Sequence, residues 1–161
     1  MLTTVHLLIG AVIGKYVNNA WVIIIISILS HYVLDFIPHY SHQGFEKFRE
    51  LGFAGIDKRL ILIGIEPILG LILVIFLIYM NKERVFPMVL GSFFAWFPDL
   101  LTFISWKYLS YKYNINIFEK ILPRPGNFLY NACNTLFGIF IQIVIAIVAI
   151  IALIFDFRFP R

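Results

Sequence analysis

Apolar runs close to the length that crosses a lipid bilayer dominate this 161-residue chain. A transmembrane helix needs about 20 apolar residues, with about 17 as a lower limit. Three runs meet that length, Ala20–Ile37, Leu60–Met80 and Phe128–Phe155, and two are shorter or less pure, Leu2–Val17 and Val85–Trp106. With 61% apolar and 14% charged residues and a mean hydropathy of +0.90, the composition lies outside the soluble range. The sequence predicts an all-α integral membrane protein with about five transmembrane helices.

These runs suggest a single membrane domain over residues 1–161. We expect a four-helix core in 1–106, an interfacial connection in 107–127 and an additional transmembrane helix in 128–156, facing lipid. Pairing residue n with n+60 matches His6 with Glu66, Gly10 with Gly70, Pro38 with Pro98 and His39 with Asp99. This pattern is consistent with a core of two repeated hairpins, although apolar hairpins also align by chance. Because proline disfavours helix in the residue before it, we expect Pro38 and Pro98 to end their helices.

Charges between the runs predict the orientation of the chain in the membrane. The side that carries the N-terminus holds eight basic residues, Lys47, Arg49, Lys58, Arg59, Lys107, Lys112, Lys120 and Arg124, against five on the other side, Lys15, Lys82, Arg84, Arg158 and Arg161. Basic loops stay inside, so the N-terminus is expected to be cytoplasmic. No basic n-region precedes Leu2, which argues against a cleaved signal peptide. The first run can span if Lys15 extends its amine to the interface.

Ionisable side chains inside these runs are the main indication of function. Such groups are expensive in hydrocarbon and usually mark a functional site, although for any single residue a structural pairing is about equally expected. The predicted helix ends bring six of them to one depth, as candidate metal ligands: His6, His31, Asp35, His39, Glu66 and Asp99. His42 is expected to lie outside this set. Imidazole and carboxylate donors suit zinc, manganese or ferrous iron, so the predicted cofactor is a divalent transition metal.

A metal next to a wet membrane surface would generate a hydroxide nucleophile. Glu66 or Asp99, if uncoordinated, could act as the catalytic general base. A lipid ester or phosphodiester would be the electrophile at that depth. Cys133 lies in an apolar run and is expected to be a buried, inert thiol. No serine nucleophile elbow or glycine-rich phosphate loop occurs in the sequence.

Three motifs resemble those of the YdjM-like family of inner-membrane metal-dependent hydrolases. They read Thr4-Val-His-Leu-Leu-Ile-Gly10, Ser30-His-Tyr-Val-Leu-Asp-Phe-Ile-Pro-His39 and Gly91-Ser-Phe-Phe-Ala-Trp-Phe-Pro-Asp99. The resemblance covers about the first 100 residues and implies a metal-dependent hydrolase. The family often has further histidines near its last helix, where this chain has Asn127, Asn131 and Asn134. That departure favours one metal ion over two.

Two other classes of function remain open from the sequence. A cation or proton transporter would also use buried His, Asp and Glu side chains. A non-catalytic scaffold would use them to hold helices together and would copurify with no metal. The expected partners are membrane lipid and a lipid-like substrate, and nucleic acid is not expected because the basic residues lie in loops next to apolar helices. The oligomeric state is not determined by the sequence.

Overall fold

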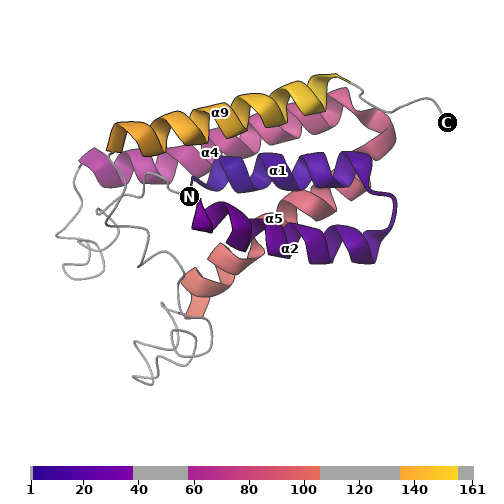
Figure 1. Cartoon of the computed structure of the whole chain (residues 1–161), viewed down its shortest axis with the longest axis horizontal. Helices are drawn as coiled ribbons and strands as arrows, with labels where there is room; N and C mark the ends of the chain where they lie inside the picture. Colours follow the sequence, from indigo (N-terminus) through magenta and orange to yellow (C-terminus); the bar gives the residue numbers. More distant parts are fainter. Residues whose placement is uncertain (1, 38–57, 106–134, 156–161) are drawn as a thin grey trace.

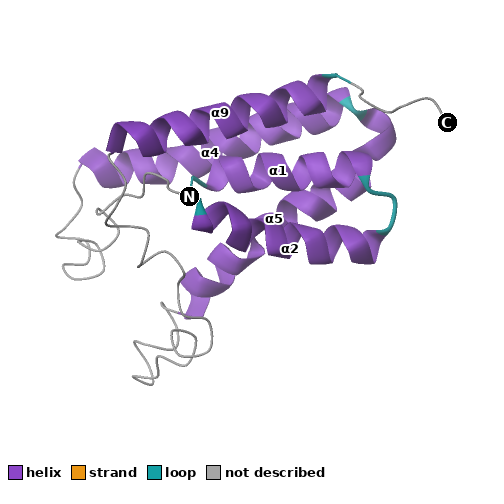
Figure 2. Ribbon diagram, viewed as in Figure 1, coloured by secondary structure: helices purple, strands orange, loops and turns teal. Residues whose placement is uncertain are grey.

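The computed structural model describes residues 2–37, 58–105 and 135–155, with side chains for 2–37, 65–101 and 136–155. The described residues are helical, with no strand among them (Figure 2). The elements are α1 (Thr3–Tyr16), α2 (Ala20–Phe36), α4 (Lys58–Met80), the 3-10 turn η2 (Lys82–Arg84), α5 (Val85–Ser105) and α9 (Thr135–Ile154). Each α-helix overlaps one of the five predicted runs, and the last run, Phe128–Phe155, is described only from Thr135. The predicted all-helical class is therefore confirmed for this part of the chain.

Helix α1 occupies the centre of the bundle, because it packs against each of the other four α-helices. Figure 1 shows α1 between the pair α4 and α9 on one side and the pair α2 and α5 on the other. The buried cluster joins Leu8 and Ala11 of α1 to Val74 of α4, Met88 of α5 and Leu153 of α9. Helix α9 thus contributes to the same core as α1, α4 and α5 while most of its surface remains exposed.

Helices α1 and α5 cross at a direct backbone contact. A Cβ atom at Gly10 would overlap the carbonyl of Gly91, and one at Gly14 would overlap the carbonyl of Pro87. The Ser92 hydroxyl donates a hydrogen bond to the Leu7 carbonyl over 3.0 Å. Residue numbers increase along α1 as they decrease along α5 at these contacts, so the two helices are antiparallel. Small residues at the crossing allow this close approach.

The contacts between helices do not follow the symmetry that a repeated hairpin predicts. In such a repeat α1 corresponds to α4 and α2 corresponds to α5. The contact between α1 and α5 would then be matched by an equally extensive contact between α4 and α2. In the described residues, α1 packs most extensively on α5, whereas α2 and α4 hardly touch. Helices α2, α4 and α5 are therefore arranged around α1, and the four do not form two equivalent hairpins.

The prolines differ in their effect on the helices. Helix α2 ends at Phe36, just before Pro38, as predicted. Helix α5 continues through Pro98 to Ser105, so the prediction that Pro98 ends this helix is wrong. Proline lacks the backbone N–H that would bond the carbonyl four residues earlier, but it can remain in a helix whose carbonyls find other partners.

Only part of the predicted set of membrane spans is visible in the described residues. Leu136–Ile154 of α9 is the one helix there that is long and apolar enough to cross a membrane by itself. Ile65–Met80 and Lys82–Leu101 meet the criterion only as a pair, which bends by 104° at its break. Helix α2 is a shorter apolar helix.

Candidate metal centre

Two buried histidines from different helices meet near the end of the bundle where α1 begins. His6 lies in the first turns of α1 and His31 near the end of α2, and both imidazoles are almost fully buried. Their rings stack with centroids 4.3 Å apart and an angle of 30° between the planes. The antiparallel packing of α1 and α2 brings the two histidines to the same depth in the bundle.

A backbone carbonyl determines how the imidazole of His31 is oriented. Its Nδ1 atom lies 2.9 Å from the carbonyl oxygen of Ala95 in α5. Because a carbonyl only accepts hydrogen bonds, we assign the proton to Nδ1. In the neutral ring, Nε2 then carries a lone pair. A hydrogen bond to the other ring nitrogen is the usual support for a metal-binding histidine.

The Nε2 atom of His31 faces two carboxylates. It lies 3.4 Å from Oδ2 of Asp35, one turn further along α2, and 3.8 Å from Oδ1 of Asp99 in α5. A lone pair and two carboxylates repel one another unless a cation lies among them. That cation is a metal ion or a proton, carried by the ring or by one of the carboxylates.

Asp35 also faces the second histidine. Its Oδ1 lies 3.4 Å from Nε2 of His6, so the two carboxylate oxygens each face one imidazole. Among the described residues, neither ring nitrogen of His6 has a partner with hydrogen-bonding geometry. Buried polar groups normally have such partners, and an exception requires an explanation. A ligand for a cation is one explanation for the buried His6 ring.

These side chains could hold a metal ion. One ligand atom each from His6, His31 and Asp99 lies within 4.8 Å of the others. Asp35 approaches both imidazoles more closely still, as described above. The Asp99 side chain is 43% exposed, so the cluster opens to the outside at this carboxylate. Two imidazole nitrogens with carboxylate oxygens form a donor set that suits zinc, manganese or iron.

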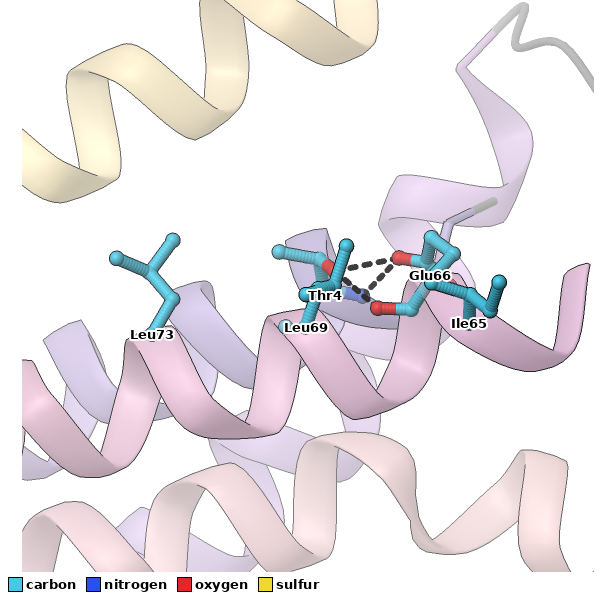
Figure 3. A pocket seen from close by; sticks show the side chains of 6 residues that line it. Thr4, Ile65, Glu66, Leu69 and Leu73 are labelled. Carbon is cyan, nitrogen blue, oxygen red and sulfur yellow. Dashed lines mark hydrogen bonds between the residues drawn. The ribbon is translucent and has the colours of Figure 1, made fainter. Parts of the chain in front are cut away.

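Glu66, which the sequence suggested as a ligand or general base, binds a different partner. Its Oε1 accepts hydrogen bonds from the backbone N–H of Thr4, over 2.8 Å, and from the Thr4 hydroxyl (Figure 3). Glu66 lines an apolar cavity of about 300 Å³ together with Thr4, Ile65, Leu69, Gly70 and Leu73. Glu66 thus lies against the first turn of α1, outside the group formed by the two histidines and Asp99.

The sequence predicted six ligands in one group, and the structure brings four of them together: His6, His31, Asp35 and Asp99. His39 and His42 lie outside the described residues. The Ala95 carbonyl was missed, and as a backbone group it leaves no signal in the sequence. The glycines at the crossing of α1 and α5 were also missed, although the spacing Gly10-x-x-x-Gly14 indicates a close helix contact.

In comparisons with known proteins, no family, no curated protein and no solved structure matches this chain. Its function therefore has to be inferred from the geometry of the polar cluster and from the surface around it.

Proposed function

We propose that the chain is a multi-pass membrane protein that binds one divalent transition metal between His6, His31, Asp35 and Asp99. We further propose that it uses this metal to hydrolyse a lipid or lipid-linked ester or phosphodiester near the cytoplasmic face.

The distribution of side chains supports a membrane environment. Large apolar residues are exposed on all the long helices except α1, for example Trp21 and Leu29 of α2, Phe76 of α4, Phe86 of α5 and Phe140 of α9. Among the residues whose side chains are described, in contrast, six polar residues are buried: His6, Lys15, Ser27, His31, Ser92 and Gln142. Soluble proteins rarely expose large contiguous apolar patches, which mark interfaces with membranes or other proteins. In membrane bundles, polar residues face the interior.

The spacing of the donor atoms is the observation that carries the metal proposal. Each Asp35 oxygen lies 3.4 Å from an imidazole Nε2, which is long for a hydrogen bond. Two donors bound tetrahedrally to one zinc, each about 2.0–2.1 Å away, are separated by about 3.3–3.4 Å. The donors therefore have the separation of ligands that share an ion. The Ala95 carbonyl fits this arrangement because it leaves the Nε2 lone pair of His31 facing the carboxylates.

The reaction follows from the position of the cluster. A bound metal ion would acidify a coordinated water and supply a hydroxide at neutral pH. Asp99 is partly exposed, so one of its carboxylate oxygens could bind the ion with the buried imidazoles while the other accepts the proton. The apolar surfaces of α2 and α5 would face lipid chains, so a lipid ester or phosphodiester is the expected substrate. Glu66 is less suited to be the base, because its Oε1 is bonded to Thr4.

Transport of a cation or proton is the competing function. A transporter needs polar groups that continue to the far side of the membrane. Among the described residues, Ser27 lies one turn from His31 on α2, and the next buried polar group toward the far end, Lys15, donates to the carbonyls of α9. This arrangement favours a site near one membrane face over a path across the bilayer.

Elemental analysis of the detergent-purified full chain tests the metal site. We expect about one equivalent of zinc, manganese or iron in the wild type and loss of that metal in His31→Ala and Asp99→Ala. Glu83→Ala is the matched control, because Glu83 is an exposed carboxylate in η2 at the opposite end of the bundle. A folded wild type that stays metal-free after incubation with Zn²⁺, Mn²⁺ and Fe²⁺ would contradict the proposal. Transport and scaffolding would then be the remaining candidate functions.

Activity toward lipids is tested separately with the metal-loaded protein. Vesicles containing phospholipids with labelled ester and phosphodiester bonds would be incubated with the metal-loaded wild type and with wild type from which a chelator has removed the metal. We expect the metal-loaded protein to release a labelled product, and the metal-free protein to release none until the metal is added back. If the protein binds metal but releases no product from any of these lipids, the metal site stands and hydrolysis of these lipids is excluded.

A further inference from the structure

From the contacts of Glu66 we infer that this residue is a positioning residue for the metal centre, which acts through the first turn of α1 and not as a ligand. This inference rests on the proposed metal site. It assigns to Glu66 a role different from the ligand or general base that the sequence suggested.

The first turn of α1 depends on Glu66 for a cap. The first N–H groups of a helix have no partner within the helix and are usually satisfied by a side chain at the N-cap. In α1 the N-cap is Leu2, whose side chain makes no capping hydrogen bond. The Glu66 carboxylate of α4 instead accepts the Thr4 N–H over 2.8 Å. Its negative charge also lies at the positive end of the α1 dipole.

Thr4 is held to α4 by more than this cap. Its hydroxyl donates to the Glu66 carboxylate and lies 3.4 Å from the Glu66 backbone carbonyl. On the same side, a Cβ atom at Gly70 would overlap the Thr4 side chain, so Thr4 packs directly on the backbone of α4 (Figure 3). These contacts fix the position of the first turn of α1 along α4 and the rotation of α1 about its own axis.

His6 follows Thr4 by two residues on the same helix. At 3.6 residues per turn, the two side chains point about 200° apart, so Thr4 faces α4 while His6 faces α2. A rotation of the first turn of α1 would therefore move the His6 imidazole relative to His31 and Asp35. Glu66 determines this rotation without contacting the metal ligands. Outer-shell residues that orient a ligand typically change metal affinity by about 10–100-fold when they are replaced.

Two pairs of variants separate positioning from ligation. Glutamine at position 66 keeps an oxygen that can accept both Thr4 hydrogen bonds, whereas alanine removes it. We expect Glu66→Gln to bind Zn²⁺ within about threefold of the wild type and Glu66→Ala to bind at least about tenfold more weakly. Thr4→Ser should behave like the wild type, and Thr4→Val should bind more weakly, because only serine keeps the hydroxyl.

The measurement is Zn²⁺ affinity by competition with a chelating dye, together with the absorption spectrum of bound Co²⁺, which reports the ligand set. The Co²⁺ spectrum of Glu66→Gln should match that of the wild type. The double variant Thr4→Val/Glu66→Ala should bind no more weakly than Glu66→Ala, because both changes remove the same contact.

Three outcomes would overturn the inference. If Glu66→Gln loses metal as completely as His31→Ala, or changes the Co²⁺ spectrum, Glu66 is a ligand. If Glu66→Ala binds Zn²⁺ as tightly as the wild type, the cap does not influence the site. A wild type that binds no metal removes the proposed function as well, and this result is distinguishable from the other two because it needs no variant.

Discussion

At the scale of single residues, Lys15 has the clearest structural role outside the metal centre. Its amine donates to the carbonyls of Ala152, Leu153 and Phe155 at distances of 3.1, 2.8 and 3.0 Å. The Tyr16 hydroxyl bonds two of the same carbonyls. The last carbonyls of a helix have no partners within it, and a cation there also interacts favourably with the helix dipole. Lys15 thus caps α9 from inside the bundle.

This contact corrects the role expected for Lys15 from the sequence. An amine that extends to the membrane interface would be exposed, whereas Lys15 is 2% exposed. The carbonyls of α9 replace the water that the amine would otherwise bind. Lys15 therefore joins two helices and does not act as an anchor at the interface.

Replacing Lys15 tests this cap. Lys15→Met keeps the length of the side chain and leaves the three carbonyls without their donor, so we expect a loss of about 1–3 kcal/mol in the free energy of unfolding. Lys15→Arg is the control, because it keeps a cation with several donors. Unfolding of the detergent-purified protein by SDS titration measures the difference. Equal stability of Lys15→Met and the wild type would show that the cap contributes nothing.

At the scale of elements, the crossing of α1 and α5 connects the fold to the site. Helix α5 supplies the Ala95 carbonyl and Asp99, and α1 supplies His6. The contact between Gly10 and Gly91 determines how closely these two helices approach. The geometry of the donors therefore depends on glycines that do not themselves touch the cluster.

Substituting one of these glycines should affect both stability and metal binding. In Gly91→Ala the new methyl group would overlap the Gly10 carbonyl, so the helices must separate. Overpacking of this kind costs about 1–3 kcal/mol, and we expect the upper end because backbone opposes backbone. Val89→Ala, on an exposed side of the same helix, should leave both properties unchanged.

The two readouts for Gly91→Ala are the SDS unfolding midpoint and the Zn²⁺ affinity. A variant with wild-type stability and affinity would mean that the two helices do not approach as closely as the structure shows. A variant that loses stability but binds Zn²⁺ normally would separate the crossing from the site.

At the scale of the whole molecule, the helices alternate in direction. Leu2 of α1 lies next to Gln142 of α9, and Lys15 lies next to Leu153, so α1 and α9 are parallel. Helix α4 runs the same way, since Thr4 contacts Glu66 and the Asn81 amide bonds the Leu153 carbonyl. Helices α2 and α5 run in the opposite direction. This is the order of directions that five successive crossings of a membrane require.

The length of α1 fits its central position. Its 14 residues span about 21 Å, less than the roughly 30 Å of a bilayer core. A helix with neighbours on both sides has little contact with lipid, so its length does not have to match the bilayer. At one end the Leu2 N–H donates to the Gln142 side chain of the longer helix α9, and at the other end the Lys15 amine donates to the Leu153 carbonyl of α9.

Cysteine labelling tests the proposed topology. In a Cys133→Ser background, we would introduce Asn18→Cys and Glu83→Cys, both at exposed positions, and Lys47→Cys in the connection predicted to be cytoplasmic. In right-side-out membrane vesicles, a membrane-impermeant maleimide should label positions 18 and 83 but not 47. Labelling of positions 18 and 83 from opposite sides would contradict the proposed order of crossings.

The sequence alone predicted the elements of this fold well, because they depend on local chemistry. Runs of apolar residues determine where helices form. The side chain of Asn19 caps α2 by accepting the N–H groups of Trp21 and Val22. The spacing of His31 and Asp35 puts both on one face of α2, whatever lies opposite. His6 and Asp99 were placed at the same depth by counting residues from the helix ends.

The choice of partners was decided only by the tertiary structure. Glu66 and Lys15 are both ionisable residues in apolar helices, and the sequence suggested metal ligation or general-base catalysis for Glu66 and exposure at the interface for Lys15. In the structure one caps the start of α1 and the other the end of α9, because the glycine crossing draws α1 into the centre of the bundle. A buried charge takes the partner that packing brings within reach. Local sequence determines which residues need partners, and the packing of helices far apart in the chain determines which partners they find.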